Sequence, residues 1–89
     1  MPKETVEQAL NILLVDDEEI IHKSVGGFLE KMGYEVFSAT HAEEGLEIFQ
    51  EQRVDIVISD IKMPGMDGLA FLDALSRLSQ DTEVILMTG

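Results

Sequence analysis

Residues 12–17 are Ile12-Leu13-Leu14-Val15-Asp16-Asp17, an apolar run that ends in two adjacent acids. A second run, Ile56-Val57-Ile58-Ser59-Asp60, also ends in an acid. Short, continuous apolar runs are typical of strands that are buried on both faces of a parallel sheet. If the two runs are neighbouring parallel strands, the three carboxylates meet at the carboxyl edge of the sheet. Open α/β sheets bind their ligands at that edge.

The segment after Asp17 has the apolar spacing of a helix. We predict this helix from about Glu18 to Met32, with Gly33 just past its last turn as a stop. Its predicted buried residues are Ile21, Val25, Phe28, Leu29 and Met32. The mixed segment 35–39 follows and suits a strand at the edge of the sheet.

The remaining elements follow from capping signals and apolar spacing. Thr40 and Glu43 have the spacing of a capping box, which predicts a helix from about His41 to Gln52. The predicted buried stripe of this helix is Ala42, Leu46 and Phe49. Asp67 can cap a third helix, whose apolar residues are Leu69, Leu72, Leu75 and Leu78. A fourth strand is predicted at residues 83–88.

The order of these elements is β-α-β-α-β-α-β. Strict alternation predicts an α/β fold in which right-handed crossovers connect parallel strands and helices cover both faces of the sheet. At 89 residues the chain has room for one small domain. Residues 1–10 are polar and acidic and are expected to form an N-terminal arm, so the domain is expected at 11–89.

Composition excludes several classes of function. The chain has 18 acidic and 6 basic residues, a net charge of −12, and lacks the Lys/Arg cluster that neutralises nucleic-acid phosphates. It has no cysteine, which excludes disulfides and thiolate metal sites. No run is long enough to span a membrane, and the first residues are too acidic for a secretory signal. We therefore expect a cytoplasmic protein that makes no direct contact with DNA or RNA.

The three carboxylates predict a cation site. Like charges at contact range repel by roughly 4 kcal/mol in an intermediate dielectric. Asp16, Asp17 and Asp60 therefore need protons or a hard cation if they lie together, and ligation by oxygen alone suits Mg²⁺.

Together these residues resemble the receiver domain of two-component response regulators. The matching pieces are the acidic pair Asp16-Asp17, the stretch 60–68 (Asp60-Ile61-Lys62-Met63-Pro64-Gly65-Met66-Asp67-Gly68), Gly33-Tyr34-Glu35-Val36 and Thr88. The resemblance covers residues 11–89. It implies a flavodoxin-like doubly wound sheet with strand order 2-1-3-4-5.

The resemblance also implies a role for each matching residue. Asp60 would be the phosphoacceptor for a histidine kinase or a histidine-phosphotransfer protein, so the chain would not be a turnover enzyme. Asp17 would ligate Mg²⁺ directly, Asp16 through water, and Lys62 through its backbone carbonyl. The hydroxyl of Thr88 would hydrogen-bond the phosphoryl group and pass the change to an output surface.

The chain departs from the receiver pattern at its end. The fourth and fifth helices and the fifth strand are absent, a deficit of roughly 30 residues at average element lengths. The lysine that the resemblance places just before the fifth strand, in contact with the phosphoryl group, is absent too. The predicted strand at 83–88 would then lie at an open sheet edge, which favours pairing with another chain. We expect either an excised piece of a longer protein or an oligomer that shields this edge.

Three alternatives stay open. Acids at 16–19 are also favoured at any helix N-terminus. A receiver fold without its lysine could serve as a dimerisation or docking module that needs no phosphorylation. A phosphohydrolase of the haloacid-dehalogenase type also uses an aspartate after a strand, but it needs a second aspartate where this chain has Lys62. His22 and His41 are predicted to be exposed helix residues, since neither has a ligand partner at metal-binding spacing.

Overall fold

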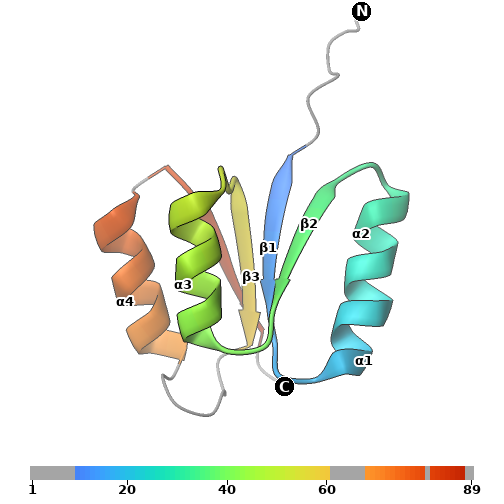
Figure 1. Ribbon diagram of the computed structural model, residues 1–89, viewed down its shortest axis with the longest axis horizontal. Helices are drawn as coiled ribbons and strands as arrows, with labels where there is room; N and C mark the ends of the chain where they lie inside the picture. The colour runs from blue at the N-terminus through green and yellow to red at the C-terminus, as the bar shows by residue number, and fades with distance from the viewer. Residues whose placement is uncertain (1–9, 61–67, 80, 88–89) are drawn as a thin grey trace, which may run out of the picture.

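The structure is a computed structural model that describes residues 10–60, 68–79 and 81–87. Its strands form one parallel sheet in the order β2-β1-β3-β4 (Figure 1). The strands are β1 (Asn11–Val15), β2 (Glu35–Ala39), β3 (Ile56–Asp60) and β4 (Glu83–Met87). The predicted alternation and the incomplete flavodoxin-like sheet are therefore confirmed. Because β1 and β3 are the two central strands, their carboxyl ends lie side by side.

Helices cover the sheet unequally. α3 (Ala42–Glu51) and α4 (Gly68–Leu78) pack together on one face, and the first helical segment lies on the other (Figure 1). Within the described ranges, no helix is long and apolar enough to cross a membrane. The core between the sheet and the paired helices consists of Leu13, Val15, Ala39, Ala42, Val54, Val57, Phe71 and Leu75. This core holds β1 and β3 firmly up to their carboxyl ends.

The close approach of α3 to β1 depends on a glycine. A Cβ atom at Gly45 would lie 3.1 Å from Cγ2 of Val15 and 3.2 Å from Cζ of Phe71. Both separations are tighter than ordinary van der Waals contact, so a Cβ at this position would require Val15, Phe71 or the helix to shift by a few tenths of an ångström. Gly45 therefore allows the helix to seat directly over the end of β1.

The first helix differs from the prediction in its middle. It begins and ends close to the predicted positions but consists of α1 (Glu19–Ile21), a π-helical segment η2 (His22–Gly26) and α2 (Gly27–Lys31). The predicted burial of Phe28 and Met32 is wrong, because these side chains are 61% and 58% exposed. A π turn contains more residues than an α turn, so every later residue is rotated relative to the expected stripe. Gly26 is the buried residue of the π segment.

The capping prediction for α3 is wrong by one residue. His41, not Thr40, is the N-cap, and its Nδ1 accepts a hydrogen bond from the backbone N–H of Glu44 at 3.2 Å. The carboxylate of Glu44 in turn accepts from the backbone N–H of Thr40 at 2.9 Å. His41 is thus an exposed cap and not a helix residue. An unprotonated imidazole nitrogen is an acceptor and takes the place expected for the threonine hydroxyl.

The buried face of α4 also differs from the prediction. Phe71 and Leu75, one turn apart, are 0% and 1% exposed, whereas Leu69 and Leu78 are 63% and 48% exposed. The sequence pattern treated four leucines as one stripe, whereas the buried pair, Phe71 and Leu75, are neighbours at i and i+4 on the helix surface. The predicted cap Asp67 lies outside the described residues.

The outer edge of the sheet is formed by β4. Ile85 lies next to Ile58 in the sheet register and is 51% exposed. Within the described part of the chain, β4 pairs only with β3. The predicted open edge is therefore present in the described structure.

Candidate functional site

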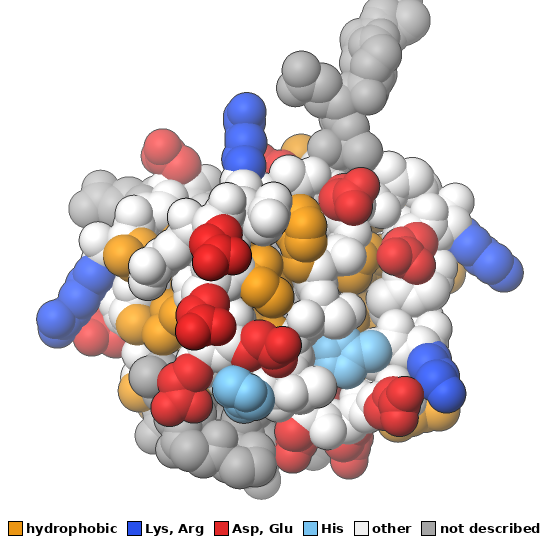
Figure 2. All heavy atoms as spheres, in the orientation of Figure 1, with side chains coloured by type: hydrophobic (Ala, Val, Ile, Leu, Met, Phe, Trp, Pro, Cys, Tyr) orange, Lys and Arg blue, Asp and Glu red, His pale blue; other side chains and the backbone are white. Residues whose placement is uncertain are grey.

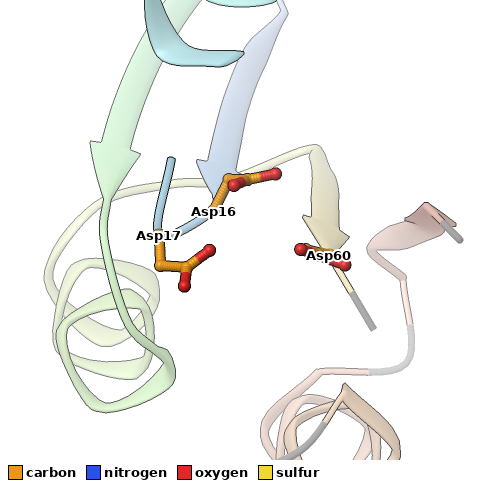
Figure 3. Close-up of side chains that lie close together, drawn as sticks. All are labelled: Asp16, Asp17 and Asp60. Atoms are coloured by element: carbon orange, nitrogen blue, oxygen red, sulfur yellow. The ribbon is translucent and has the colours of Figure 1, made fainter. Parts of the chain in front are cut away.

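Three carboxylates from two strand ends converge at the carboxyl edge of the sheet (Figure 3). β1 pairs with β3 so that Val15 lies opposite Ser59, which brings Asp16 next to Asp60. One oxygen from each of Asp16, Asp17 and Asp60 lies within 4.8 Å of the other two. The three acids predicted from the sequence are thus brought together by strand pairing, although they are far apart in the chain.

Asp16 is the most tightly held of the three. Its side chain is buried, and its Oδ1 accepts a hydrogen bond from the backbone N–H of Glu18 at 2.8 Å. Its own backbone N–H donates to the carbonyl of Ala39 at 3.1 Å, which ties the loop to the end of β2. The loop that leaves β1 is therefore fixed before the first helix begins.

Asp17 and Asp60 are more accessible than Asp16. Asp17 is exposed, and Asp60 is half-buried at the last position of β3. The neighbouring Ser59 is fully buried, and its Oγ donates to the backbone carbonyl of Asp60 at 3.1 Å. This bond restrains the backbone that follows the acid. Asp60 thus combines a fixed main chain with a carboxylate that faces the other two (Figure 3).

The donor set fits a hard divalent cation. Mg²⁺ takes oxygen ligands at about 2.1 Å, so opposite ligands of one ion lie about 4.2 Å apart. The separation of up to 4.8 Å requires only a small side-chain movement or one ligand that acts through water. Two or three adjacent carboxylates also gain from a cation because it offsets their mutual repulsion. The predicted ligand Lys62 and the predicted switch residue Thr88 lie outside the described residues.

Comparison with known protein families shows to which family the chain belongs. The model of the response regulator receiver domain matches residues 12–89. The chain belongs to this family. Receiver domains are signalling modules of two-component systems, which agrees with the resemblance of the acidic pair and of the stretch that begins at Asp60.

Individual relatives support the same assignment for this receiver domain. It is 36% identical over 78 residues to sporulation initiation phosphotransferase F of Bacillus subtilis, and the match covers 88% of the chain and 63% of that protein. A CheY-like receiver from Methanospirillum hungatei has a TM-score of 0.89 and 35% identity, covering 92% of this chain and 66% of that one. The chain thus spans less than two thirds of the length of these two relatives.

Two solved structures of one further relative bear on ligands and partners. Response regulator TrrA from Thermotoga maritima, in complex with Mg²⁺ and BeF, has a TM-score of 0.84 and 38% identity, covering 89% of this chain and 69% of that one. TrrA in complex with the histidine kinase ThkA has a TM-score of 0.83 and 38% identity, covering 90% and 69%.

Sequence reasoning missed one residue of this receiver site. His22 is half-buried and not exposed, and its Nε2 lies 2.7 Å from the backbone carbonyl oxygen of Asp16. Its Nδ1 is buried and has no hydrogen-bond partner. The available signal was the position of a histidine in the first turns after an acidic pair, where a side chain can fold back on the loop.

Proposed function

We propose that Asp60 accepts a phosphoryl group from a phosphohistidine of a histidine kinase or a histidine-phosphotransfer protein. A carboxylate oxygen of Asp60 forms the new P–O bond. The P–N bond of the donor breaks, and the departing imidazole keeps the electron pair of that bond. The observation that carries this proposal is the convergence of Asp16, Asp17 and Asp60 at adjacent strand ends. The chain accepts the group on its own side chain and does not turn over a small substrate.

The geometry suits phosphoryl transfer because this reaction needs positioning and charge neutralisation more than covalent machinery. Asp17 would bind Mg²⁺ directly, Asp16 through water, and Asp60 and the carbonyl of Lys62 would complete the protein ligands. The bound cation supplies positive charge between the nucleophile and the incoming phosphoryl oxygens. The hydrogen bond from Ser59 to the backbone carbonyl of Asp60 supports the proposal because it restrains the main chain that carries the carboxylate.

Thr88 is proposed as the switch residue. Support for this assignment comes from Met87, the residue before it in the sequence, which pairs with Asp60 in the sheet register. A hydroxyl is a neutral donor that can rotate toward a new phosphoryl oxygen. Movement of this side chain would change the surface that the downstream output reads.

The donor protein is proposed to dock beside the acids, on the start of the first helix. Ile20 is 66% exposed there, three residues after Asp17. An exposed isoleucine next to a charged site suits a partner that must exclude water from the reacting atoms. Acidic side chains are spread over the face drawn in Figure 2, and the net charge is −12. This charge supports a protein partner and not a nucleic acid.

Self-association through β4 is a separate proposal. An exposed strand edge offers unpaired backbone groups to a second chain, and Ile85 adds an apolar side chain next to it. A second copy that pairs along β4 would cover both features.

Phosphoacceptance is tested by incubating the protein with acetyl phosphate and Mg²⁺ and measuring its intact mass. One phosphoryl group should add to the protein, and Asp60→Asn should abolish the addition. Asp81→Asn is the matched control, because Asp81 is an exposed acid just before β4, at the opposite end of the sheet. Labelling that persists in Asp60→Asn, or that requires no divalent cation, would contradict the proposal.

A further inference from the structure

His22 makes a specific contact with the loop that carries two of the three acids. Its ring Nε2 lies 2.7 Å from the backbone carbonyl oxygen of Asp16. A carbonyl oxygen can only accept a hydrogen bond, so the Nε2 atom must carry the proton and donate it. The contact therefore fixes which nitrogen of the ring is protonated.

The other ring nitrogen shows that packing alone does not explain this residue. Nδ1 is buried and lacks a hydrogen-bond partner. Burying a polar atom without a partner costs free energy, and an apolar side chain of similar size would avoid this cost. The contribution specific to histidine at position 22 is thus the hydrogen bond from Nε2.

The bond acts on the peptide group that joins the two adjacent acids. The carbonyl of Asp16 and the N–H of Asp17 belong to the same planar peptide unit. Asp16, the residue before this peptide group, is already restrained by two hydrogen bonds. Its backbone N–H donates to the carbonyl of Ala39, and its Oδ1 accepts from the backbone N–H of Glu18. The hydrogen bond from His22 also restrains the carbonyl oxygen, so the peptide group between Asp16 and Asp17 cannot rotate freely. The orientation of this peptide group determines the direction of the Asp17 side chain.

The helix that carries the ring has an unusual turn at this position. His22 is the first residue of η2, and π turns occur frequently at functional sites. The far end of the same segment, Gly26, is seated on the sheet, where an added Cβ would lie 3.6 Å from Leu14. The segment is thus anchored to the sheet through Gly26 and to the loop after β1 through the ring of His22.

We propose that His22 is a positioning residue whose Nε2–H bond to the Asp16 carbonyl orients Asp16 and Asp17 for a shared divalent cation. This inference rests on the proposed Mg²⁺ site but not on phosphoryl transfer. His22 does not touch the cation or the phosphoryl group. It acts through the peptide unit between the two ligands, as a partner outside the ligand set does at many metal sites.

The test measures Mg²⁺ affinity by calorimetric titration of the unphosphorylated protein. His22→Leu removes the donor and should weaken Mg²⁺ binding about tenfold, the lower end of the effect of such outer partners. His22→Gln carries an amide N–H at a similar distance from the backbone and should stay within about threefold of the parent. His41→Asn, which keeps a capping acceptor away from the acids, should leave the affinity unchanged.

A second readout is independent of metal binding. Long-range ¹H–¹⁵N NMR correlations of the neutral imidazole ring should show that His22 is protonated at Nε2. A ring protonated at Nδ1 would overturn the inference, as would parental Mg²⁺ affinity in His22→Leu or equal losses in His22→Leu and His22→Gln. Absence of Mg²⁺ binding by the parent would overturn it too.

The two proposals fail separately. If the parent binds Mg²⁺ but takes no phosphoryl group, the proposal that Asp60 is a phosphoacceptor is wrong. The Mg²⁺ affinities of the His22 variants still decide whether His22 is a positioning residue. If the parent takes a phosphoryl group and His22→Leu binds Mg²⁺ as tightly as the parent, His22 is not a positioning residue. The proposal that Asp60 is a phosphoacceptor is then unaffected.

Discussion

At the residue scale, the site gathers like charges that the fold forces together. Asp16 is buried, Asp60 is half-buried, and both lie within reach of the exposed Asp17. Under the proposed function each acid contributes to the cation site, and each repels the other two when no cation is bound. Function and stability therefore make opposite demands on the same side chains.

Asp17→Asn should show the effect of this charge on stability separately from its effect on cation binding. Removing one charge reduces repulsion, so the free energy of unfolding in EDTA should rise, on the order of 0.5 kcal/mol for an exposed charge. The gain on adding excess Mg²⁺ should fall in the variant. For the parent this gain should be about 2.7 kcal/mol at a hundred times the dissociation constant. Urea unfolding with and without Mg²⁺ measures both quantities.

Asp81→Asn is the control for a general effect of lower net charge. It should leave the Mg²⁺-dependent gain at the parental value. If Asp17→Asn is less stable than the parent in EDTA, the carboxylate of Asp17 stabilises the fold more than its repulsion with Asp16 and Asp60 destabilises it, which would contradict the prediction.

The three acids could be predicted from the sequence because they lie at the ends of two predicted strands, and parallel strands end at a common edge. His22 could not be predicted in the same way. Its contact depends on the exact rotation of a helix that begins three residues earlier and contains a π turn. Apolar spacing reports which residues are buried together but not where one ring nitrogen points.

At the element scale, two glycines in helices differ in what surrounds them. Gly45 permits close packing of α3 on β1, whereas an added Cβ at Gly27 would meet nothing within 4 Å. The first glycine is required by the fold. The second weakens the helix without a packing gain, since glycine costs about 1 kcal/mol relative to alanine in a helix.

Paired alanine substitutions test this difference. Gly27→Ala should raise the free energy of unfolding by about 0.5–1 kcal/mol. Gly45→Ala should lower it by about 1–3 kcal/mol, because its Cβ would be overpacked against Val15 and Phe71. Denaturant unfolding of both variants under the same conditions decides the question. Equal effects of the same sign would show that helix propensity outweighs packing at both sites.

Element positions were more predictable than element details. Strands and helices fall within a few residues of the positions expected from apolar runs and stop signals such as Gly33, which has a φ of 99°. The buried stripe of the first helix was mispredicted because the pattern assumes regular α turns throughout. The cap of α3 was mispredicted because a histidine ring can replace a hydroxyl as acceptor.

At the scale of the whole molecule, the outer edge of the sheet is the surface proposed for contact between copies of the chain. β4 lies at the end of the strand order, and its Ile85 is 51% exposed. The high negative charge opposes association, whereas the strand edge favours it. Raising the ionic strength should therefore strengthen association.

Ile85→Lys should weaken self-association of the 89-residue protein. The added charge would lie on an exposed face of the edge strand, and charged residues on edge strands oppose pairing. Light scattering over a concentration series should show a dimer for the parent and a monomer for the variant. Ile20→Lys, which changes an exposed isoleucine on the first helix, is the control and should not change the mass. A parent that is a stable monomer at all concentrations would contradict the proposed pairing.

The pairing of β1 with β3 has a consequence for the newly made chain. The first half of the polypeptide supplies Asp16 and Asp17, but their partner arrives only after a helix, an edge strand and a second helix have been traversed. Until β1 pairs with β3, a partly folded chain does not hold the three acids together. If the proposed function holds, a partly folded copy lacks the complete acidic site and should not accept a phosphoryl group.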